Sequence, residues 1–191
     1  DVHVLTLSAT PIPRTLQMAL TGVRDLSLIT TPPVDRLAIR SFVMPFDPVV
    51  IREAVLREMH RGGQTFLVTP RIKDITELKV QMKEIVPEAR IAVGHGQMPA
   101  AELDKVMNDF YDGKYDILLS TAIIESGLDI PTANTMIIHN AHLFGLAQLY
   151  QMRGRVGRGK LRAYAYFLLP HHKLLTKNAT RRLEVMSTLD T

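Results

Sequence analysis

From residue 39 onward, short apolar segments alternate with amphipathic ones, and this alternation constrains the fold more than any other feature of the chain. Between the apolar segments, hydrophobic residues recur every three or four positions, which is the spacing of one helical face. Strands that alternate with helices build parallel sheets, because a parallel connection requires a long crossover. The sequence therefore predicts a doubly wound α/β domain. Its six strands are expected at residues 39–44, 65–69, 90–93, 117–119, 135–138 and 163–169.

Proline, glycine and acidic residues mark the expected ends of the helices. The glycine pair at 62–63 should end the first helix, because glycine is unfavourable in a helix interior. Asp74 and Glu77 have the spacing of a capping box and should begin the second helix. Pro99 should open the third, and a fourth is expected at residues 146–152.

The organisation along the chain suggests a domain boundary near residue 33. Residues 30–35 lack periodicity and contain two prolines, so residues 33–38 are interpreted as a linker. Residues 1–32 are too short for a domain and resemble the last strands of a preceding one. Residues 39–170 form the predicted α/β domain, and an amphipathic helix follows within residues 171–191. Because the chain lacks an initiator Met and ends inside this helix, we expect a piece of a longer protein.

Composition excludes some classes of protein and leaves others open. No cysteine is present, which excludes disulfides and thiolate metal sites. No apolar run approaches the roughly 20 residues that span a bilayer, so a soluble cytoplasmic protein is expected. The net charge of +4 is a mild bias, but residues 153–162 contain five basic residues and no acidic one. This distribution fits an acidic partner such as nucleic acid.

The segment QLYQMRGRVGR at residues 148–158 contains the densest group of residues with ligand-binding chemistry. Guanidinium groups are permanently charged forks that match phosphate oxygens, and two of them could stabilise the charge on a γ-phosphoryl group in transit. Gly154 and Gly157 make a continuous helix unfavourable and would let the backbone approach a ligand closely. On composition alone, a solvated basic turn or a patch that holds a nucleic-acid backbone remains the simpler interpretation.

Three further segments follow predicted strands, where ligands bind in doubly wound sheets. Thr121 and Asp129 belong to the loop after the strand at 117–119, and they could contact phosphate and ribose. The glycine-flanked His95 ends the strand at 90–93, and residues 8–10 follow an apolar run near the start of the chain. Each of these also fits an ordinary turn or helix cap when taken alone.

Two kinds of site are missing from the sequence. There is no GxxxxGK[ST] phosphate loop, and no adjacent Asp-Glu pair offers a carboxylate for Mg²⁺. The chain alone is therefore not expected to hydrolyse ATP. The histidines at 139, 142 and 171–172 lack a carboxylate at ligand spacing, so structural or surface roles are favoured and no metal site is predicted.

Five segments, in this order and spacing, carry a family resemblance: LSATPIPRTL, TFLVTPRI, GHGQM, STAIIESGLDIP and QLYQMRGRVGR. Together they resemble the later motifs of superfamily 2 helicases, within the RecG-like branch. The stretch PTANTMIIHNAHLFGLAQLYQMRGRVGRG is similar to the transcription-repair-coupling translocases of that branch, and the linker TPPVDRLAIRSFV favours them over RecG. The resemblance covers essentially the whole chain.

The resemblance implies a motor with two RecA-like lobes that binds ATP and Mg²⁺ in the cleft between them. This chain would supply the end of lobe one and most of lobe two, a mostly parallel P-loop NTPase-type sheet. ATP and Mg²⁺ would be bound mainly by the upstream lobe. A helical hairpin would begin in residues 171–191, with its first helix at about 176–189. The resemblance assigns Arg155 and Arg158 as arginine fingers, Gly127, Asp129 and Gln151 to nucleotide binding, Ser8, Ala9 and Thr10 to coupling, and Thr121, Arg71, Gly94, His95 and Gly96 to the DNA backbone.

The resemblance also implies partners. Such a protein would move on double-stranded DNA, displace stalled RNA polymerase and recruit excision repair through UvrA, using modules outside this segment. Two alternatives stay open: a RecG-type fork-remodelling helicase, and a passive nucleic-acid-binding module with no ATP turnover.

Overall fold

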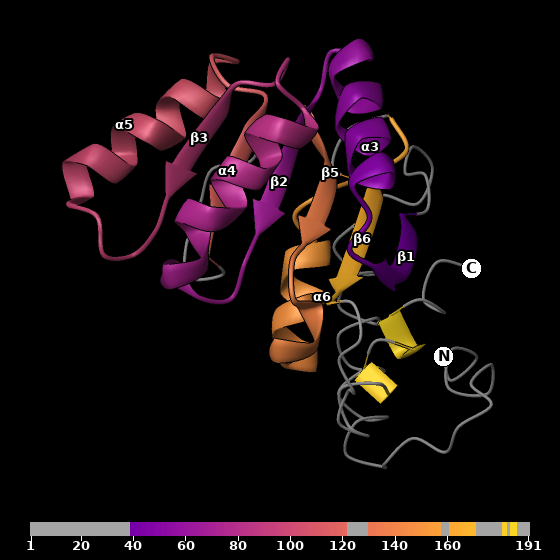
Figure 1. Ribbon diagram of the computed structural model, residues 1–191. Coiled ribbons are helices and arrows are strands. Elements are labelled where there is room, and N and C mark those ends of the chain that lie inside the picture. The colour runs from indigo at the N-terminus through magenta and orange to yellow at the C-terminus, as the bar shows by residue number, and fades with distance from the viewer. Residues whose placement is uncertain (1–38, 122–129, 158–160, 171–180, 183, 187–191) are drawn as a thin grey trace, which may run out of the picture.

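The computed structural model describes residues 39–121, 130–157, 161–170, 181–182 and 184–186 (Figure 1). Its centre is a six-stranded sheet in the order β1-β6-β5-β2-β4-β3, and every strand pair is parallel. The predicted doubly wound α/β fold and its six strands are confirmed. In chain order the elements are β1 (Arg40–Pro45), α3 (Pro48–His60), β2 (Gln64–Val68), η1 (Ile72–Asp74), α4 (Ile75–Ile85), β3 (Ile91–Gly94), α5 (Ala100–Tyr111), β4 (Ile117–Ser120), β5 (Ala133–Ile138), η2 (Ala141–Leu143), α6 (Leu146–Arg153) and β6 (Tyr164–Leu169).

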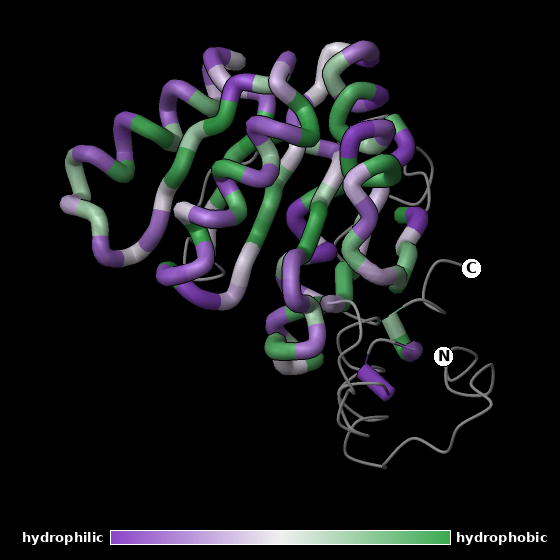
Figure 2. The backbone as a smooth tube through the Cα atoms, viewed as in Figure 1, coloured by the Kyte–Doolittle hydropathy of each residue, from purple (hydrophilic) through white to green (hydrophobic). Residues whose placement is uncertain are grey.

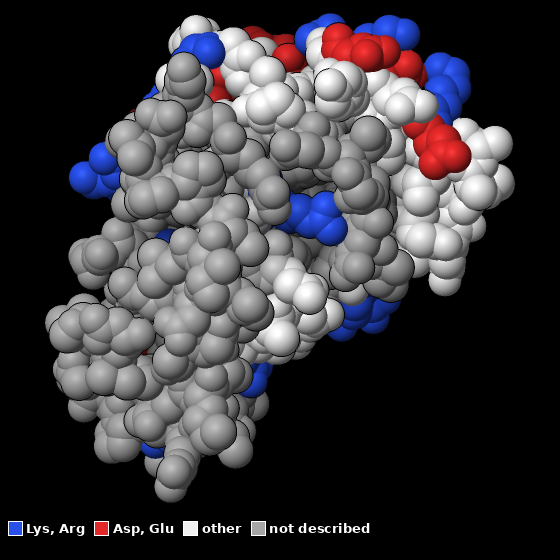
Figure 3. Space-filling model, turned by 180° about the vertical axis from the view of Figure 1, so that it is seen from behind, with Lys and Arg blue, Asp and Glu red and all other residues white. Residues whose placement is uncertain are grey.

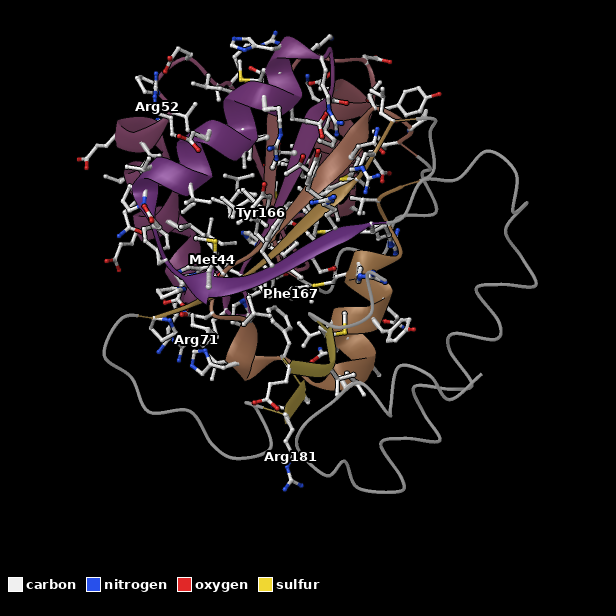
Figure 4. All side chains as sticks on the ribbon, turned by 90° about the vertical axis from the view of Figure 1, so that its right-hand side faces the viewer. Met44, Arg52, Arg71, Tyr166, Phe167 and Arg181 are labelled. Carbon is white, nitrogen blue, oxygen red and sulfur yellow. The ribbon has the colours of Figure 1, made fainter. Side chains whose placement is uncertain are left out.

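Helices cover both faces of the sheet. Helices α3 and α4 pack on one face through Val55 and Leu78, which contact strand residues such as Leu67. Helices α6 and α5 pack on the other face, through Leu149 and Phe110 respectively. Figure 4 shows α3 and α6 on opposite sides of the sheet. The result is a three-layer sandwich, as the alternation of strands and helices requires.

The central strands are buried along their whole length because both of their faces are covered. All four residues of β4 and all six of β5 are buried. In Figure 2 the hydrophobic residues are concentrated along the strands and the inward sides of the helices. The edge strand β1 has a mixed pattern instead, with exposed and half-buried residues.

The helix boundaries follow the predicted signals with one exception. Asp47 caps α3 by accepting a hydrogen bond from the Val49 amide at 3.0 Å. After that helix, Gly62 adopts φ +80°, which lets the chain turn into β2. The predicted capping box at Asp74 is wrong: its side chain makes no cap hydrogen bond and instead accepts from Arg71 Nε at 2.9 Å. The guanidinium of Arg71 binds this carboxylate in place of the helix amides.

The chain leaves the neighbouring strands β2 and β5 in opposite directions. From β2 it continues through α4 on one face to β3, and from β5 it continues through α6 on the other face to β6. Adjacent strands whose outgoing connections diverge in this way define a topological switch point, where doubly wound proteins open a crevice at the carboxyl ends of the strands. The switch point of this domain lies between β2 and β5.

Several predictions fall outside the described residues. They include the end of a preceding lobe at 1–32, the linker at 33–38 and most of the trailing segment at 171–191. Among the described residues, no helix combines the length and hydrophobicity needed to cross a membrane.

Candidate functional site

The carboxyl ends of four strands place candidate residues in one row across the sheet. Register pairs Val68 of β2 with both Ser120 of β4 and Ile138 of β5, and Ser120 with Gly94 of β3. The next residue on each strand belongs to the same row, because the strands are parallel. We call this set the carboxyl-edge row; in spatial order it consists of His139, Thr69, Thr121 and His95. At about 4.8 Å per strand it spans roughly 14 Å.

Thr121 and the Gly94–Gly96 turn form one half of the row. The Thr121 side chain is buried, and its hydroxyl has no hydrogen-bond partner among the described residues. A buried hydroxyl without a partner is unfavourable, and a hydrogen bond to a ligand would remove that cost. The turn after β3 is closed by hydrogen bonds from the Met98 amide to the His95 carbonyl at 3.1 Å and from the Gln97 amide to His95 Nδ1 at 3.2 Å.

Thr69 and His139 form the other half of the row, at the switch point. The Thr69 hydroxyl and His139 Nδ1 are 3.0 Å apart. Their backbones are tied to the same strand ends: the Thr69 amide donates to Ser120 at 2.9 Å, and the His139 amide donates to Val68 at 2.7 Å. These bonds hold the two side chains in a fixed relation across β2 and β5.

Arg71 extends from the loop just after Thr69. Figure 4 shows it beyond Met44, at the arrowhead end of β1 where the strands finish. Half of its side chain is exposed, at 50%, and only its Nε is engaged in the ion pair with Asp74. Figure 3, seen from behind, shows mixed charges along the upper rim, whereas the described charged side chains lower on that face are mainly basic.

The His139 ring has a lowered pKa. Burial is the main cause because it disfavours the charged imidazolium, and the charge of Arg71 and the nearby His142 lower the pKa further. The carboxylate of Asp74 opposes the shift. The ring is therefore neutral at physiological pH.

The arginine segment lies at the opposite edge of the sheet. Helix α6 begins just after the carboxyl end of β5, where the Gln148 side chain accepts from the Gly145 amide at 3.0 Å. It ends at Arg153, whose Nε donates to Ser41 Oγ of β1 at 2.9 Å. The predicted break of the helix at Gly154 is confirmed, since Gly154 is its C-cap. Arg155 therefore follows the helix, and it is half-buried.

Gly157 fixes the end of this segment against the amino ends of the strands. Its φ is +81°, and a β-carbon there would lie 3.1 Å from Ile39 Cγ1. Its amide donates to Asn134 Oδ1 of β5 at 3.3 Å. The close approach predicted for this glycine is thus made to Ile39 and Asn134 of the domain itself.

The structure separates the predicted site residues into two groups. Thr121, Arg71 and the Gly94–Gly96 turn lie at the carboxyl edge, whereas Arg155 lies at the amino edge. Gln151 is exposed on α6, which runs between the two edges. Strand β5 has six residues, so the edges are about 20 Å apart.

Six predicted site residues lie outside the described residues: Ser8, Ala9, Thr10, Gly127, Asp129 and Arg158. Thr121 and Ile130 flank the segment that contains two of them. Within the described ranges there is also no group of three or more His, Asp or Glu residues that could hold a metal ion.

The structure adds His139 to this row, a residue for which the sequence favours a structural or surface role. Its position directly after a buried strand was the available signal, because that is where doubly wound sheets place ligand contacts. The partner Thr69 belongs to the TFLVTPRI segment, 70 positions earlier. Only the strand order brings these two residues together.

A six-stranded parallel sheet of this order, covered on both faces and carrying two such edges, is the fold of a RecA-like helicase C-terminal lobe. Comparison with known families agrees: the model described as helicase conserved C-terminal domain matches residues 49–160. The chain belongs to this family.

Curated relatives narrow the similarity. The chain is 59% identical over 186 residues to the transcription-repair-coupling factor of Rickettsia bellii, covering 97% of this chain and 17% of that protein. It is 54% identical over 190 residues to the transcription-repair-coupling factor of Escherichia coli, covering 100% of this chain and 17% of that protein. The chain thus spans about one sixth of the length of these two curated relatives.

Solved structures share the fold. RecG bound to a three-way DNA junction superposes with a TM-score of 0.71 and 40% identity, over 96% of this chain and 25% of RecG. The C-terminal domain of the DEAD-box protein Dbp5 superposes with a TM-score of 0.54 and 21% identity, over 78% of this chain and 83% of that domain. The second likeness shows the fold alone.

Proposed function

We propose that this chain is the C-terminal motor lobe of an ATP-dependent double-stranded DNA translocase that couples transcription to nucleotide-excision repair. The observation that carries the proposal is that the residues predicted to bind phosphate lie in two groups, one at each edge of one sheet. A motor lobe must contact a nucleotide and a nucleic acid at the same time, and two edges about 20 Å apart allow this.

The amino edge would face the nucleotide. Arg155 sits just beyond α6, and a guanidinium there can stabilise charge that develops on a transferred γ-phosphoryl group. Arg158 would act with it, and Gly127, Asp129 and Gln151 would complete the nucleotide contacts. ATP and Mg²⁺ would be bound mainly by an upstream lobe, because this chain carries no GxxxxGK[ST] segment. Residues 1–32 would be the end of that lobe, with Ser8, Ala9 and Thr10 linking hydrolysis to movement, and residues 33–38 the linker.

The carboxyl edge would face the DNA backbone. Thr121 has a buried hydroxyl with no partner in the part of the chain that the structure describes, Arg71 offers a half-exposed guanidinium, and the turn at Gly94–Gly96 follows the adjacent strand. Hydroxyl, guanidinium and backbone NH groups are the usual phosphate contacts of proteins that hold DNA without reading its sequence. A motor that moves along DNA needs contacts of this kind.

Helix α6 supplies a rigid link between the edges. It starts beside the carboxyl end of β5, packs along the sheet through Leu146, Leu149 and Met152, and ends at the Arg153–Ser41 contact. A displacement of Arg155 on ATP hydrolysis would therefore be transmitted along α6 to the DNA edge. Residues 171–191 would begin the helical hairpin that completes this coupling.

In the whole protein, this motor would displace RNA polymerase stalled at lesions and recruit UvrA, through modules outside the chain. The identity of 59% and 54% to two transcription-repair-coupling factors supports this part of the proposal.

The test is Arg155→Ala in the full-length protein. ATP binding should persist, because the phosphate loop belongs to the other lobe, while DNA-stimulated hydrolysis should fall by about 10³-fold or more. Arg90→Ala is the matched control: Arg90 is exposed and paired with Asp116, and its loss should leave turnover unchanged. Near-normal hydrolysis by Arg155→Ala would refute the arginine-finger role.

A RecG-type fork-remodelling activity is the second candidate, favoured by the 40% identity to RecG over 96% of the chain. The two functions differ in substrate. A transcription-coupling motor should displace a stalled polymerase from linear duplex DNA, whereas a fork-remodelling enzyme should act on a three-way junction without polymerase. A passive nucleic-acid-binding module would bind DNA in either assay with no effect of ATP.

A further inference from the structure

The pair formed by Thr69 and His139 occupies the switch point between β2 and β5. Ligands of doubly wound proteins bind in the crevice at this place, outside the carboxyl ends of the strands. Both residues belong to the carboxyl-edge row, next to Thr121, and the loop that carries Arg71 begins here. The pair therefore lies in the middle of the surface proposed to face DNA.

The His139 ring is held on several sides. Nδ1 lies 3.0 Å from the Thr69 hydroxyl, and the backbone amide of the same residue donates to Val68 at 2.7 Å. The Phe46 ring packs against the imidazole edge-on, with centroids 6.0 Å apart. Because these contacts fix the orientation of the imidazole, the direction of Nε2 is fixed as well.

The protonation state of the ring follows from its surroundings. The charged and titratable groups that act on it are Asp74, Arg71 and His142, and burial lowers its pKa. In the neutral ring, a Thr69 hydroxyl that donates to Nδ1 leaves the proton on Nε2. Nε2 is then a donor, which suits an acceptor such as a phosphate oxygen.

We propose that His139 is a further DNA-backbone contact of this lobe: Thr69 holds its ring, and Nε2–H donates to a phosphate oxygen. The proposal rests on the proposed function, since it adds a residue to the DNA-facing edge. The row comprises four strand ends over roughly 14 Å, so one DNA backbone can contact His139 and Thr121 together.

The chemistry favours a phosphate over the other acceptors of a duplex. A motor that moves along DNA must hold features that repeat at every step, and phosphate oxygens do so whereas base edges do not. Arg71, two residues beyond Thr69, adds a half-exposed guanidinium to the same place, and among the described residues it pairs with Asp74 through Nε, which keeps the terminal nitrogens available for another acceptor.

The test replaces His139 in the full-length protein and measures affinity for a random-sequence DNA duplex. His139→Gln places an amide donor near the position of Nε2, whereas His139→Asn places its amide near Nδ1. His139→Gln should stay within about threefold of wild type, and His139→Asn should lose about tenfold, the order expected for one hydrogen bond to a charged group. Equal losses in the two variants, or no loss in His139→Asn, would overturn the proposal.

Thr69→Val tests how the ring is held. Removing the hydroxyl frees the ring and should weaken DNA binding several-fold, but it should add little in the His139→Asn background. Additive losses would show that the two residues act independently. Thermal unfolding of each variant is measured in parallel, and the comparison of Gln with Asn at the same position separates lost contact from lost stability.

Acid pH gives a second readout that a structural role would not change. Below the lowered pKa the ring gains a positive charge, so binding should become more salt-dependent, with the slope of log K against log salt steeper by up to about 0.9. His139→Gln should lack the slope that wild type gains as pH falls below the lowered pKa of His139. Other histidines titrate in both proteins, so the difference between them reports His139; identical slopes at acid pH would contradict the contact.

Failure of this inference is distinguishable from failure of the proposed function. If the wild-type protein binds no duplex with or without ATP, the proposed function is wrong. If wild type binds and Arg71→Ala weakens binding while His139→Asn does not, only the role of His139 is wrong. Arg52→Ala, which removes a surface ion pair with Glu88, is the control for a lost arginine.

Discussion

Replacing Gly157 by alanine should test how the arginine segment is held in place. Gly157 has φ +81°, where a residue with a β-carbon is strained by about 1–2 kcal/mol. The added β-carbon would also lie 3.1 Å from Cγ1 and 3.3 Å from Cδ1 of Ile39, which is nearly buried. Overpacking of this degree costs about 1 kcal/mol more. The expected loss is about 2–3 kcal/mol in the free energy of unfolding.

Gly113 provides a matched control for the backbone strain. Its φ is also +81°, but no atom lies within 4 Å of the position that a β-carbon would take. Gly113→Ala should therefore cost only the strain, about 1–2 kcal/mol. The difference between the two variants isolates the contact with Ile39.

Urea unfolding of the chain, followed by circular dichroism, measures both losses. For a protein of this size, each kcal/mol lowers Tm by about 2–4 °C, so Gly157→Ala should melt about 4–12 °C lower than wild type. Adding Ile39→Val removes one of the two clashing carbons and should recover part of the extra loss through a favourable coupling energy. Equal losses at Gly157 and Gly113, with no coupling to Ile39, would refute this account of the segment.

Two further predictions concern stability. Glu58→Ala should cost about 2–3 kcal/mol in urea unfolding, because it removes a fully buried carboxylate that accepts two hydrogen bonds from Arg61 and one from Thr135. The 22% exposure of Arg61 keeps the loss below that of a wholly buried pair, and Glu88→Ala in the exposed pair with Arg52 should change stability far less. Burial lowers the pKa of His139 below its ordinary value of 6.5. The neutral ring therefore contributes its full stability above pH 6.5, and this contribution is lost as pH falls through the lower folded pKa. On acidification, Tm should fall less in His139→Gln than in wild type, and equal falls would contradict this.

The fold was predictable because the apolar segments mark the strands and the residues that end helices mark the connections, and these two signals agree along most of the domain. The burial of β4 and β5 on both faces follows from the apolar runs at residues 117–119 and 136–138, and a parallel sheet is where such runs fit. The end of α3 was also predictable, from the glycine pair at 62–63. The capping box at Asp74 failed because the pattern considers only residues within the helix, whereas Arg71 lies just before it.

The candidate site was less predictable, because its geometry depends on strand order. Nothing in the linear pattern states that β2 lies between β5 and β4, yet this order alone brings Thr69 beside His139. For the same reason, the sequence could not show that Arg155 and Arg71 belong to opposite edges. The spacing of motifs gives their separation along the chain, whereas their distance in space depends on the order of the strands in the sheet.

The arginine-rich segment shows why positive charge alone does not define a site. Arg153, in the middle of QLYQMRGRVGR, donates to Ser41 and so fastens α6 to the edge strand. Gly157, directly before Arg158, turns the chain against Ile39 and Asn134. These two contacts hold the segment on both sides of Arg155. Catalysis by a positioned charge requires that the charge not reorganise during the reaction. The residues around Arg155 therefore matter as much as its guanidinium, and substitutions that loosen them should reduce turnover while leaving every arginine in place.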